Sequence, residues 1–332
     1  MPELRKDPIV GRWVIISTER GKRPSDWASE AKLKGSGFCP FCPGNEDKTP
    51  PEIMAVRPMT EQRDVPGWEI RVVPNKFPAL QIEGDLARRG EGIYDMLNGI
   101  GAHEVVIETP NHALDFADLS VDSVANILRI FRDRALDLKK DTRFKYILIF
   151  KNHGVSAGAS LEHTHSQLIA TPIIPKRVLE ELDGSRRHYK YKERCIFCDI
   201  IRQEELSQKR VVTALDSFLT IEPFAPRFPF ETWILPKQHF SHFESMPEEM
   251  YNKLAISLKD ALTRINKALG FPPFNFMLHS SPIQESSLLE YHWHLEIIPK
   301  LTKIAGFEWG SGFYINSTPP EIAAEHLQNV QQ

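Results

Sequence analysis

The chain has 332 residues, enough for two domains that each have a hydrophobic core. Hydrophobic residues make up 41% of it and charged residues 26%, a composition typical of globular proteins. The net charge of −3 gives no basic surplus for binding nucleic acid, and no stretch is apolar enough to span a membrane, so we expect neither partner.

The N-terminal segment is charged and has no apolar stretch of the kind found in signal peptides. We therefore expect a cytoplasmic protein, in which paired cysteines bind metal more often than they form disulfides. The first such pair is Cys39 and Cys42. Pro43 and Gly44 follow it and favour a tight turn, whereas a redox dithiol needs a helix that begins there. Metal binding is the favoured interpretation, and a redox pair is the alternative.

Residues 103–112 read as a strand, a proline-containing turn and a histidine, His112. A helix is predicted to follow from an N-cap at Ser120, because apolar residues recur at helical spacing. This apolar stripe consists of Val124, Ile127, Leu128, Phe131 and Leu138. The β-branched and aromatic residues at 146–150 predict the next strand.

The loop at 154–160 consists of small residues, which would let backbone N–H groups approach a phosphate. The strand after it carries His163, His165 and Gln167 at alternate positions, so their side chains share one face. A neutral imidazole whose other nitrogen donates to a carbonyl is a competent nucleophile, and we predict this role for His165. Gln167 offers a neutral amide donor to a phosphoryl oxygen. The alternative is that His165 only supports a metal site.

The second part of the chain repeats this order of elements. Residues 230–239 again read as a strand, a turn and a histidine, and a helix follows with Pro247 as its first residue and Gly270 at its end. The apolar residues of this helix are Leu254, Leu258, Leu262 and Ile265. A strand at 274–278 and a second His-x-His motif at 292–294 complete the repeat, which indicates an internal duplication.

The polar stretch 183–187 is predicted to separate a catalytic domain, 1–184, from a non-catalytic domain, 185–332. Strands that alternate with long helices in this order predict an α+β fold, with antiparallel sheets and helices packed on one face. In the second domain Glu296 stands where the first has Gln167, and its carboxylate would repel a phosphoryl group.

Cysteines and histidines at matching places form two complete ligand sets for tetrahedral zinc. His163 follows His112 by 51 positions, and His292 follows His239 by 53. The sets are Cys39, Cys42, His112 and His163 in the first half, and Cys195, Cys198, His239 and His292 in the second. Neither set leaves an open position for a catalytic water, so we predict two structural zinc ions per chain. The histidines that compete with His112 and His239 are His103, His153, His242 and His279.

The motif from His163 to Gln167, after a small-residue loop that Phe150-Lys151-Asn152 precedes, resembles the active site of the galactose-1-phosphate uridylyltransferase family. That family is a branch of the histidine-triad superfamily with duplicated halves. The resemblance spans nearly the whole chain and includes 20–24, 73–78 and 306–308. It implies two tandem histidine-triad-like domains.

The resemblance further implies that His165 takes a nucleoside monophosphate from a nucleotide sugar and forms a nucleotidyl-histidine, in a ping-pong reaction. Gln167 would then neutralise the phosphoryl oxygens, and a sugar 1-phosphate or inorganic phosphate would accept the nucleotide. The implied substrate-binding residues are Arg20, Arg23, Asn75, Asn152, Gly158, Ser160 and Glu308. The family is typically homodimeric, and the two arginines would reach in from a partner subunit.

Two departures from the family pattern concern the substrate. Thr164 and Ser166 replace the proline and the glycine or cysteine of the galactose enzymes, and the tail after Glu308 lacks their sugar-binding glutamine. The tail, with residues 101–105, is closer to the plant-type ADP-glucose phosphorylases. We expect a UDP-glucose–hexose-1-phosphate uridylyltransferase first, with an ADP-glucose phosphorylase as the alternative and a histidine-triad hydrolase or a zinc scaffold as rivals.

Overall fold

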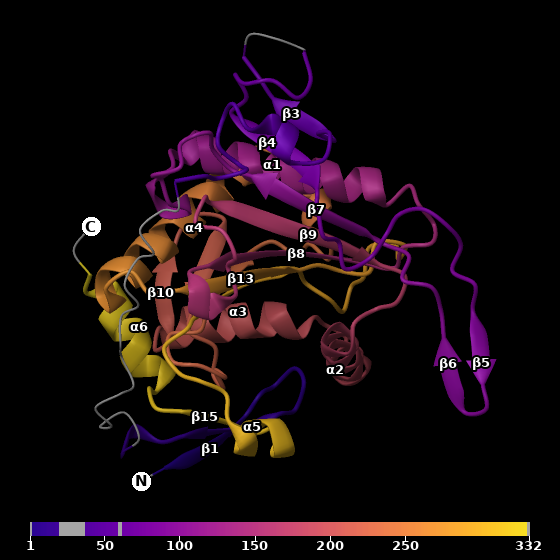
Figure 1. Ribbon diagram of the computed structural model, residues 1–332. Helices are drawn as coiled ribbons and strands as arrows, with labels where there is room; N and C mark the ends of the chain where they lie inside the picture. Colours follow the sequence, from indigo (N-terminus) through magenta and orange to yellow (C-terminus); the bar gives the residue numbers. More distant parts are fainter. Residues whose placement is uncertain (1, 20–36, 59–61, 331–332) are drawn as a thin grey trace.

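The computed structural model describes residues 2–19, 37–58 and 62–330, and its main element is a large antiparallel sheet (Figure 1). The strands from the first half are β3 (Met54–Val56), β4 (Ile70–Pro74), β7 (Ala102–Ile107), β8 (Tyr146–His153) and β9 (His165–Thr171). Those from the second half are β10 (Val211–Ala214), β11 (Phe218–Ile221), β12 (Thr232–Pro236), β13 (Phe274–His279) and β14 (His294–Pro299). Within the described residues the order across the sheet is β10-β11-β12-β14-β13-β8-β9-β7-β4-β3.

This order is nearly a palindrome of the two halves. In each half, strands lead to one long helix, α1 (Val121–Leu138) or α4 (Glu248–Leu269), and two further strands follow that helix. β8 pairs with β13 in antiparallel register, for example at Asn152 and Asn275, and thereby joins the two halves into one sheet. The structure confirms the expected α+β class with antiparallel strands.

The two long helices begin and end close to their predicted positions. Ser120 caps α1 by accepting a hydrogen bond from the Ser123 N–H at 3.0 Å, and every residue of the predicted apolar stripe is buried. In α4, Pro247 is the N-cap and not the first helical residue as predicted. Its extended backbone (ψ 150°) lies outside the helical region, so the helix begins one residue later. Gly270 ends α4 in the left-handed conformation (φ 72°).

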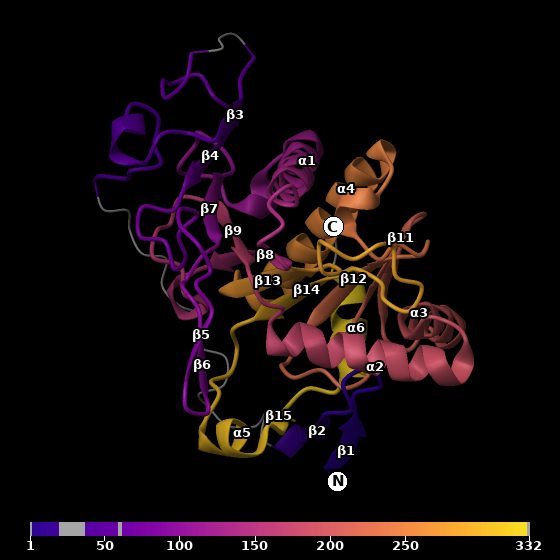
Figure 2. The same cartoon turned by 90° about the vertical axis from the view of Figure 1, so that its right-hand side faces the viewer.

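Helices cover the two faces of the sheet unequally (Figure 2). α1, α4 and α6 (Pro320–Gln328) share one hydrophobic core on one face, as expected. α2 (Lys176–Lys192) and α3 (Ile196–Ser207) pack against Leu219 and Trp233 on the other face of the second half. That face of the first half carries Cys39, Phe41 and Trp68 from loops and turns in place of helices.

The stretch 183–187, which was expected to link two domains, is helical and lies within α2. Gly184 is needed there because an added Cβ would lie 1.9 Å from the carbonyl oxygen of Ile9. The N-terminal segment is therefore packed directly against the middle of α2.

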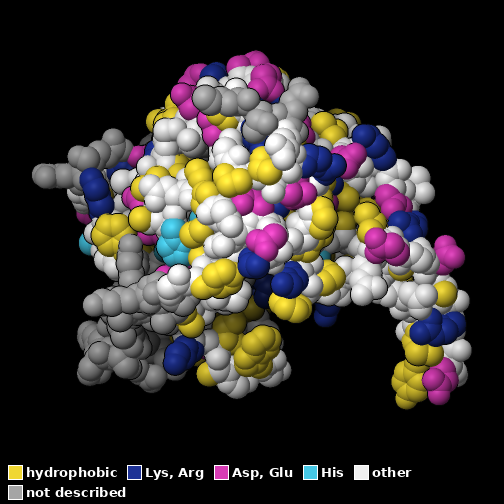
Figure 3. Space-filling model, turned by 45° about the horizontal axis from the view of Figure 1, so that its top comes forward, with side chains coloured by type: hydrophobic (Ala, Val, Ile, Leu, Met, Phe, Trp, Pro, Cys, Tyr) yellow, Lys and Arg dark blue, Asp and Glu magenta, His cyan; other side chains and the backbone are white. Residues whose placement is uncertain are grey.

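Smaller elements lie at the edge of the molecule. β1 (Glu3–Lys6), β2 (Trp13–Ile16) and β15 (Tyr314–Asn316) form a small sheet beside the short helix α5 (Gly306–Ser311). The hairpin of β5 (Arg89–Glu91) and β6 (Tyr94–Met96) protrudes from the body, with an apolar tip at Ile93 that is 90% exposed (Figures 1 and 3). Among the described residues, no helix is apolar over a length that would cross a membrane.

Candidate functional site

The four residues of the first predicted ligand set lie together at the start of β9. The Sγ atom of Cys42 is 3.4 Å from Nδ1 of His112 and 3.6 Å from Nδ1 of His163, and the Sγ atom of Cys39 is 3.7 Å from the latter. The ligand atoms of all four residues lie within 4.8 Å of one another. Nε2 of His163 donates to the carbonyl of Thr109 at 2.7 Å, so Nδ1 is the nitrogen left for a metal. Two thiols and two imidazoles at this spacing fit a tetrahedral metal ion.

The second set has almost the same geometry. The Sγ atom of Cys198 is 3.4 Å from Nδ1 of His239 and 3.6 Å from Nδ1 of His292, and the set with Cys195 again falls within 4.8 Å. Nε2 of His292 donates to the carbonyl of Pro236 at 2.9 Å. The structure thus brings together both sets of residues that the sequence paired.

The predicted nucleophile, His165, is held as a neutral imidazole. Its Nδ1 lies 2.8 Å from the carbonyl oxygen of His163, so Nδ1 carries the proton and donates it, and Nε2 keeps a lone pair. Burial and the positive charge of Lys151 lower the pKa of His165 to about 4. The rings of Phe41 and His165 meet edge to face, with 5.3 Å between their centroids, and Phe41 thereby helps to bury the imidazole. At neutral pH the ring is therefore uncharged and nucleophilic.

On the opposite side of the same strand lies a buried polar network that sequence reasoning missed. Nζ of Lys151 donates to the Glu108 carboxylate at 2.5 Å, to Oγ1 of Thr164 at 2.8 Å and to the His165 carbonyl at 2.8 Å. Glu108 also accepts from the hydroxyls of Thr164 and Ser166. The sequence did contain a signal for this network: Thr164 and Ser166 alternate with the two histidines, so their hydroxyls lie on the opposite face of the strand. This network fixes the backbone that carries His165.

The remaining predicted residues, apart from Ser160, fall into four groups. Asn152 and Gly158 are neighbours: Asn152 accepts from the Asn275 amide at 2.8 Å, and Gly158, where an added Cβ would lie 3.6 Å from the Asn152 amide nitrogen, takes the left-handed conformation (φ 87°) that turns the small-residue loop. Asn75 lies beside His103, whose Nε2 is 2.8 Å from Oε1 of Gln167. Glu308 caps α5 by accepting from the Ala305 N–H, and Figure 1 shows α5 well away from β9. Arg20 and Arg23 lie outside the described residues.

A cavity of about 270 Å³ opens beside His165. Its walls include Asn152 and Ser160 from the first half, and Phe271 and Pro273 from the second half. The polar groups of the small-residue loop therefore face a concave space, the usual form of a small-molecule site.

The position of the second half that corresponds to His165 is closed. His294 is stacked on His279 at 4.9 Å and lies 5.1 Å from Trp233 between ring centroids, and burial lowers the pKa of His294 to about 4. Glu296 is ion-paired with Arg227. Glu181, His279 and His294 also bring three possible metal-binding atoms within 4.8 Å. His294 is 1% exposed, and the cavity that it lines has a volume of only about 20 Å³, which is too small for a nucleotide.

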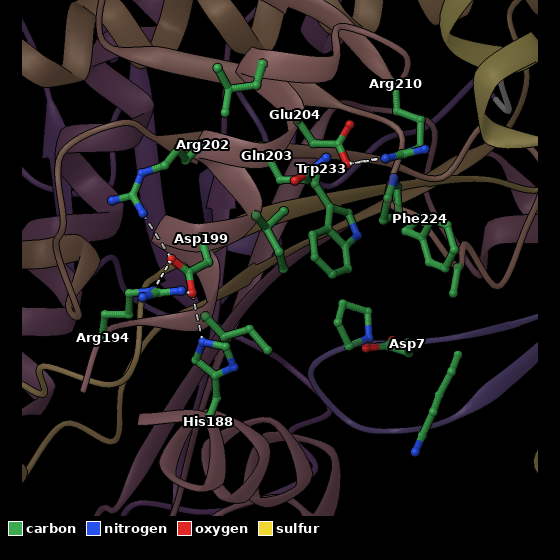
Figure 4. Close-up of a pocket in the computed structure, with 17 residues that line it drawn as sticks. Asp7, His188, Arg194, Asp199, Arg202, Gln203, Glu204, Arg210, Phe224 and Trp233 are labelled. Atoms are coloured by element: carbon green, nitrogen blue, oxygen red, sulfur yellow. Dashed lines mark hydrogen bonds and ion pairs between the residues drawn. The ribbon is translucent and has the colours of Figure 1, made fainter. Parts of the chain in front are cut away.

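A larger cavity, of about 640 Å³, lies between α3 and the N-terminal segment and shares no residue with the cavity beside His165 (Figure 4). Trp233 and Phe224 form part of its wall. The ion pairs along this wall are Arg194–Asp199, Arg202–Asp199 and Arg210–Glu204. Because these guanidinium groups already have carboxylate partners, they attract an anion less than free cations would.

Comparison with known proteins finds one family in two matches along the chain. Family models match the galactose-1-phosphate uridyl transferase N-terminal domain over residues 1–175 and its C-terminal domain over 181–327. The chain is 38% identical to an ADP-glucose phosphorylase of Arabidopsis thaliana, covering 99% of this chain and 93% of the relative. It is 29% identical to a galactose-1-phosphate uridylyltransferase of Thermotoga maritima, covering 100% and 99%.

Solved structures show the same relationship. The crystal structure of the Arabidopsis thaliana ADP-glucose phosphorylase with bound ADP-glucose superposes with a TM-score of 0.85 at 36% identity, over 100% of both chains. A uridylyltransferase structure gives 0.78 at 29% identity, over 99% of this chain and 97% of the other. The chain belongs to the galactose-1-phosphate uridyl transferase family of nucleotidyltransferases.

Proposed function

We propose that this protein transfers a nucleoside monophosphate from a nucleotide sugar through a covalent intermediate on Nε2 of His165. The observation that carries the proposal is the 2.8 Å hydrogen bond from Nδ1 of His165 to the His163 carbonyl, which leaves Nε2 unprotonated at the cavity wall. Gln167 stands where a third histidine of a hydrolase would stand, and an amide cannot act as a general acid or base for water. The intermediate therefore waits for a phosphate acceptor.

In the first step Nε2 attacks the phosphorus next to the nucleoside, and the bond from that phosphorus to the sugar phosphate oxygen breaks. The sugar 1-phosphate leaves as an anion and needs no proton. The imidazole becomes positively charged, and the His163 carbonyl that accepts from Nδ1 stabilises this charge. In the second step an oxygen of the acceptor attacks the same phosphorus, the P–N bond breaks, and neutral His165 is restored.

We infer that the donor is ADP-glucose and the acceptor is inorganic phosphate, so that the products are glucose 1-phosphate and ADP. The sequence alone placed uridylyl transfer first, but the comparisons support this alternative better. Identity to the ADP-glucose phosphorylase is 38%, against 29% for the Thermotoga maritima uridylyltransferase, over nearly the whole chain in each case. Galactose-1-phosphate uridylylation is the second candidate, since both family models carry that description.

We propose zinc as the metal of both Cys2His2 clusters. Thiolate and imidazole are the ligands that zinc takes in structural sites, and each cluster offers four of them. A metal held there would clamp the turn at 39–42 to the start of β9 and fix the position of the strand. We also propose a cytoplasmic location and a homodimer. The reason for the dimer is that Glu308 lies apart from His165 within one chain and would reach the site from a partner subunit.

The direct test is to incubate the purified protein separately with ADP-glucose and with UDP-glucose and to measure its intact mass. An adenylyl adduct that inorganic phosphate discharges as ADP is the expected result, and His165→Gly should give none. A uridylyl adduct discharged by galactose 1-phosphate would establish the second candidate. Steady hydrolysis without a dischargeable adduct would contradict nucleotidyl transfer.

A further inference from the structure

The side chain of His103 lies at the centre of a set of hydrogen bonds beside Gln167. Its Nδ1 is 3.1 Å from the backbone N–H of Ala79, and its Nε2 is 2.8 Å from Oε1 of Gln167. A backbone N–H can only donate, so Nδ1 must be the acceptor and a neutral ring carries its proton on Nε2. The Nε2–H group therefore donates to Gln167.

This assignment decides which way the Gln167 amide points. The amide oxygen accepts from His103, so the NH2 group is the end left for a ligand, and it donates to no other group in the described part of the chain. The Asn75 amide does not compete for the proton on Nε2 of His103. Its oxygen, Oδ1, already accepts from the Phe77 N–H, and the atom that faces His103 is its nitrogen, Nδ2, which is a donor. Two donors at 3.1 Å form no hydrogen bond with each other.

We propose that His103 is a positioning residue, which holds the Gln167 amide with its NH2 group toward the phosphoryl oxygens of the nucleotide. Without His103 the amide could rotate and present its carbonyl oxygen to a phosphoryl group, with repulsion in place of stabilisation. This inference rests on the proposed nucleotidyl transfer and names a residue that acts through Gln167.

The second half provides an internal comparison. Val105 of β7 pairs with Gln167, and Trp233 of β12 pairs with Glu296, so the residue two positions earlier on each strand corresponds: His103 in the first half and Glu231 in the second. A carboxylate cannot donate to the residue at the position of Gln167, which in that half is Glu296, and both carboxylates accept from Arg227 instead. The histidine and the glutamine thus occur together in the half with the open histidine, and both are replaced in the closed half.

The test is a double-mutant cycle on the rate at which the adenylyl adduct forms in a single turnover with saturating ADP-glucose. The variants are His103→Phe, Gln167→Ala and the two combined, with His103→Gln as the conservative control. His103→Phe should slow adduct formation by up to about 100- to 1,000-fold, the range expected when one donor to a developing oxyanion is lost. His103→Gln keeps an amide donor and should stay within about 5-fold of the wild type.

Non-additivity distinguishes orientation of Gln167 from a general effect on the loop around Ala79. If His103 acts through Gln167, the double variant should be no slower than Gln167→Ala. A His103→Phe substitution that slows the Gln167→Ala protein as much as the wild type, or that leaves the wild-type rate unchanged, would overturn the inference. His103→Ala repeats the measurement if the phenylalanine lowers soluble yield.

The proposed function fails separately from this inference. If the wild-type protein takes no nucleotide from any nucleotide sugar, both fall. If the wild type forms the adduct and the cycle is additive, only the role of His103 is contradicted.

Discussion

The two halves of the sheet have the same order of elements, but different side chains are buried on the face opposite the histidines of their His-x-His motifs. Under His165 the network contains Lys151, Glu108 and the hydroxyls of Thr164 and Ser166. The places of the second half that match Lys151, Thr164 and Ser166 hold apolar side chains that are buried in the core: Leu278, Trp293 and Leu295. Both strands are stable, so the fold does not require the polar network. Its presence under one histidine indicates a role in fixing that histidine.

The face of the sheet that carries His165 and His294 also differs between the halves: it is open in the first half and filled by side chains in the second. Beside His165 lie a cavity and a neutral amide, Gln167, whereas beside His294 lie the rings of Trp233 and His279 and the charged pair of Glu296 and Arg227. Helices α2 and α3 then cover that side of the second half. The duplicated unit thus forms an open site in one half and a closed, packed support in the other.

The largest difference between the halves should appear when each histidine is removed. His165→Gly should lower the rate of nucleotide transfer by at least about 10⁴-fold, because the nucleophile is lost. His294→Ala should retain the covalent intermediate. Rates from rapid-quench measurements, with circular dichroism as the check on folding, compare the two. Equal losses in both variants would contradict the assignment of one reactive half.

Removal of a proposed metal ligand should affect both halves alike, because we propose a structural zinc ion in each cluster. Cys39→Ser and Cys195→Ser should each lower the zinc content by about one ion per chain and reduce thermal stability. Metal analysis of the wild type should give about two zinc ions per chain. A content near one would show that the clusters differ despite their matching geometry.

The buried network can be converted to the apolar form found in the second half. Lys151→Leu should destabilise the protein by about 3–5 kcal/mol, since Glu108 is left charged without its partner. Lys151→Leu with Glu108→Leu should recover much of this loss, because apolar replacement of a buried pair is often nearly neutral. Urea unfolding measures both. A double variant as unstable as the single one would show that the network is required for the fold.

A smaller difference concerns pH. His279 is deeply buried, which opposes protonation, but the charges of Glu181 and Glu296 prevail and raise its pKa to about 9. Because the folded pKa lies above the ordinary value of about 6.5, its contribution is fully present below that pH and is lost as pH rises to about 9. It should amount to at most about 3 kcal/mol. Unfolding measured from pH 6 to pH 10 should show this loss in the wild type and a flatter profile in His279→Gln.

The sequence predicted the long helices and the grouping of the Cys2His2 residues well, because both depend on the spacing of residues along the chain. Residue order alone pointed to α1, α4 and the two ligand sets. It did not reveal Lys151 with Glu108, or His103 with Gln167, because these pairs form only when β7, β8 and β9 align in register. The helical nature of 183–187 was missed for a related reason. Its polar residues suggest a linker, and only tertiary packing shows Gly184 against Ile9.

The central claim is that only one of the two duplicated histidine motifs is reactive. The most direct test is to digest the protein after a brief incubation with ADP-glucose and to map the modified residue by peptide mass spectrometry. The predicted result is an adenylyl group on the peptide that contains His165 and an unmodified peptide around His294. A nucleotide on His294 would contradict the claim, because it would place the chemistry in the half where Glu296 and the stacked rings close the site.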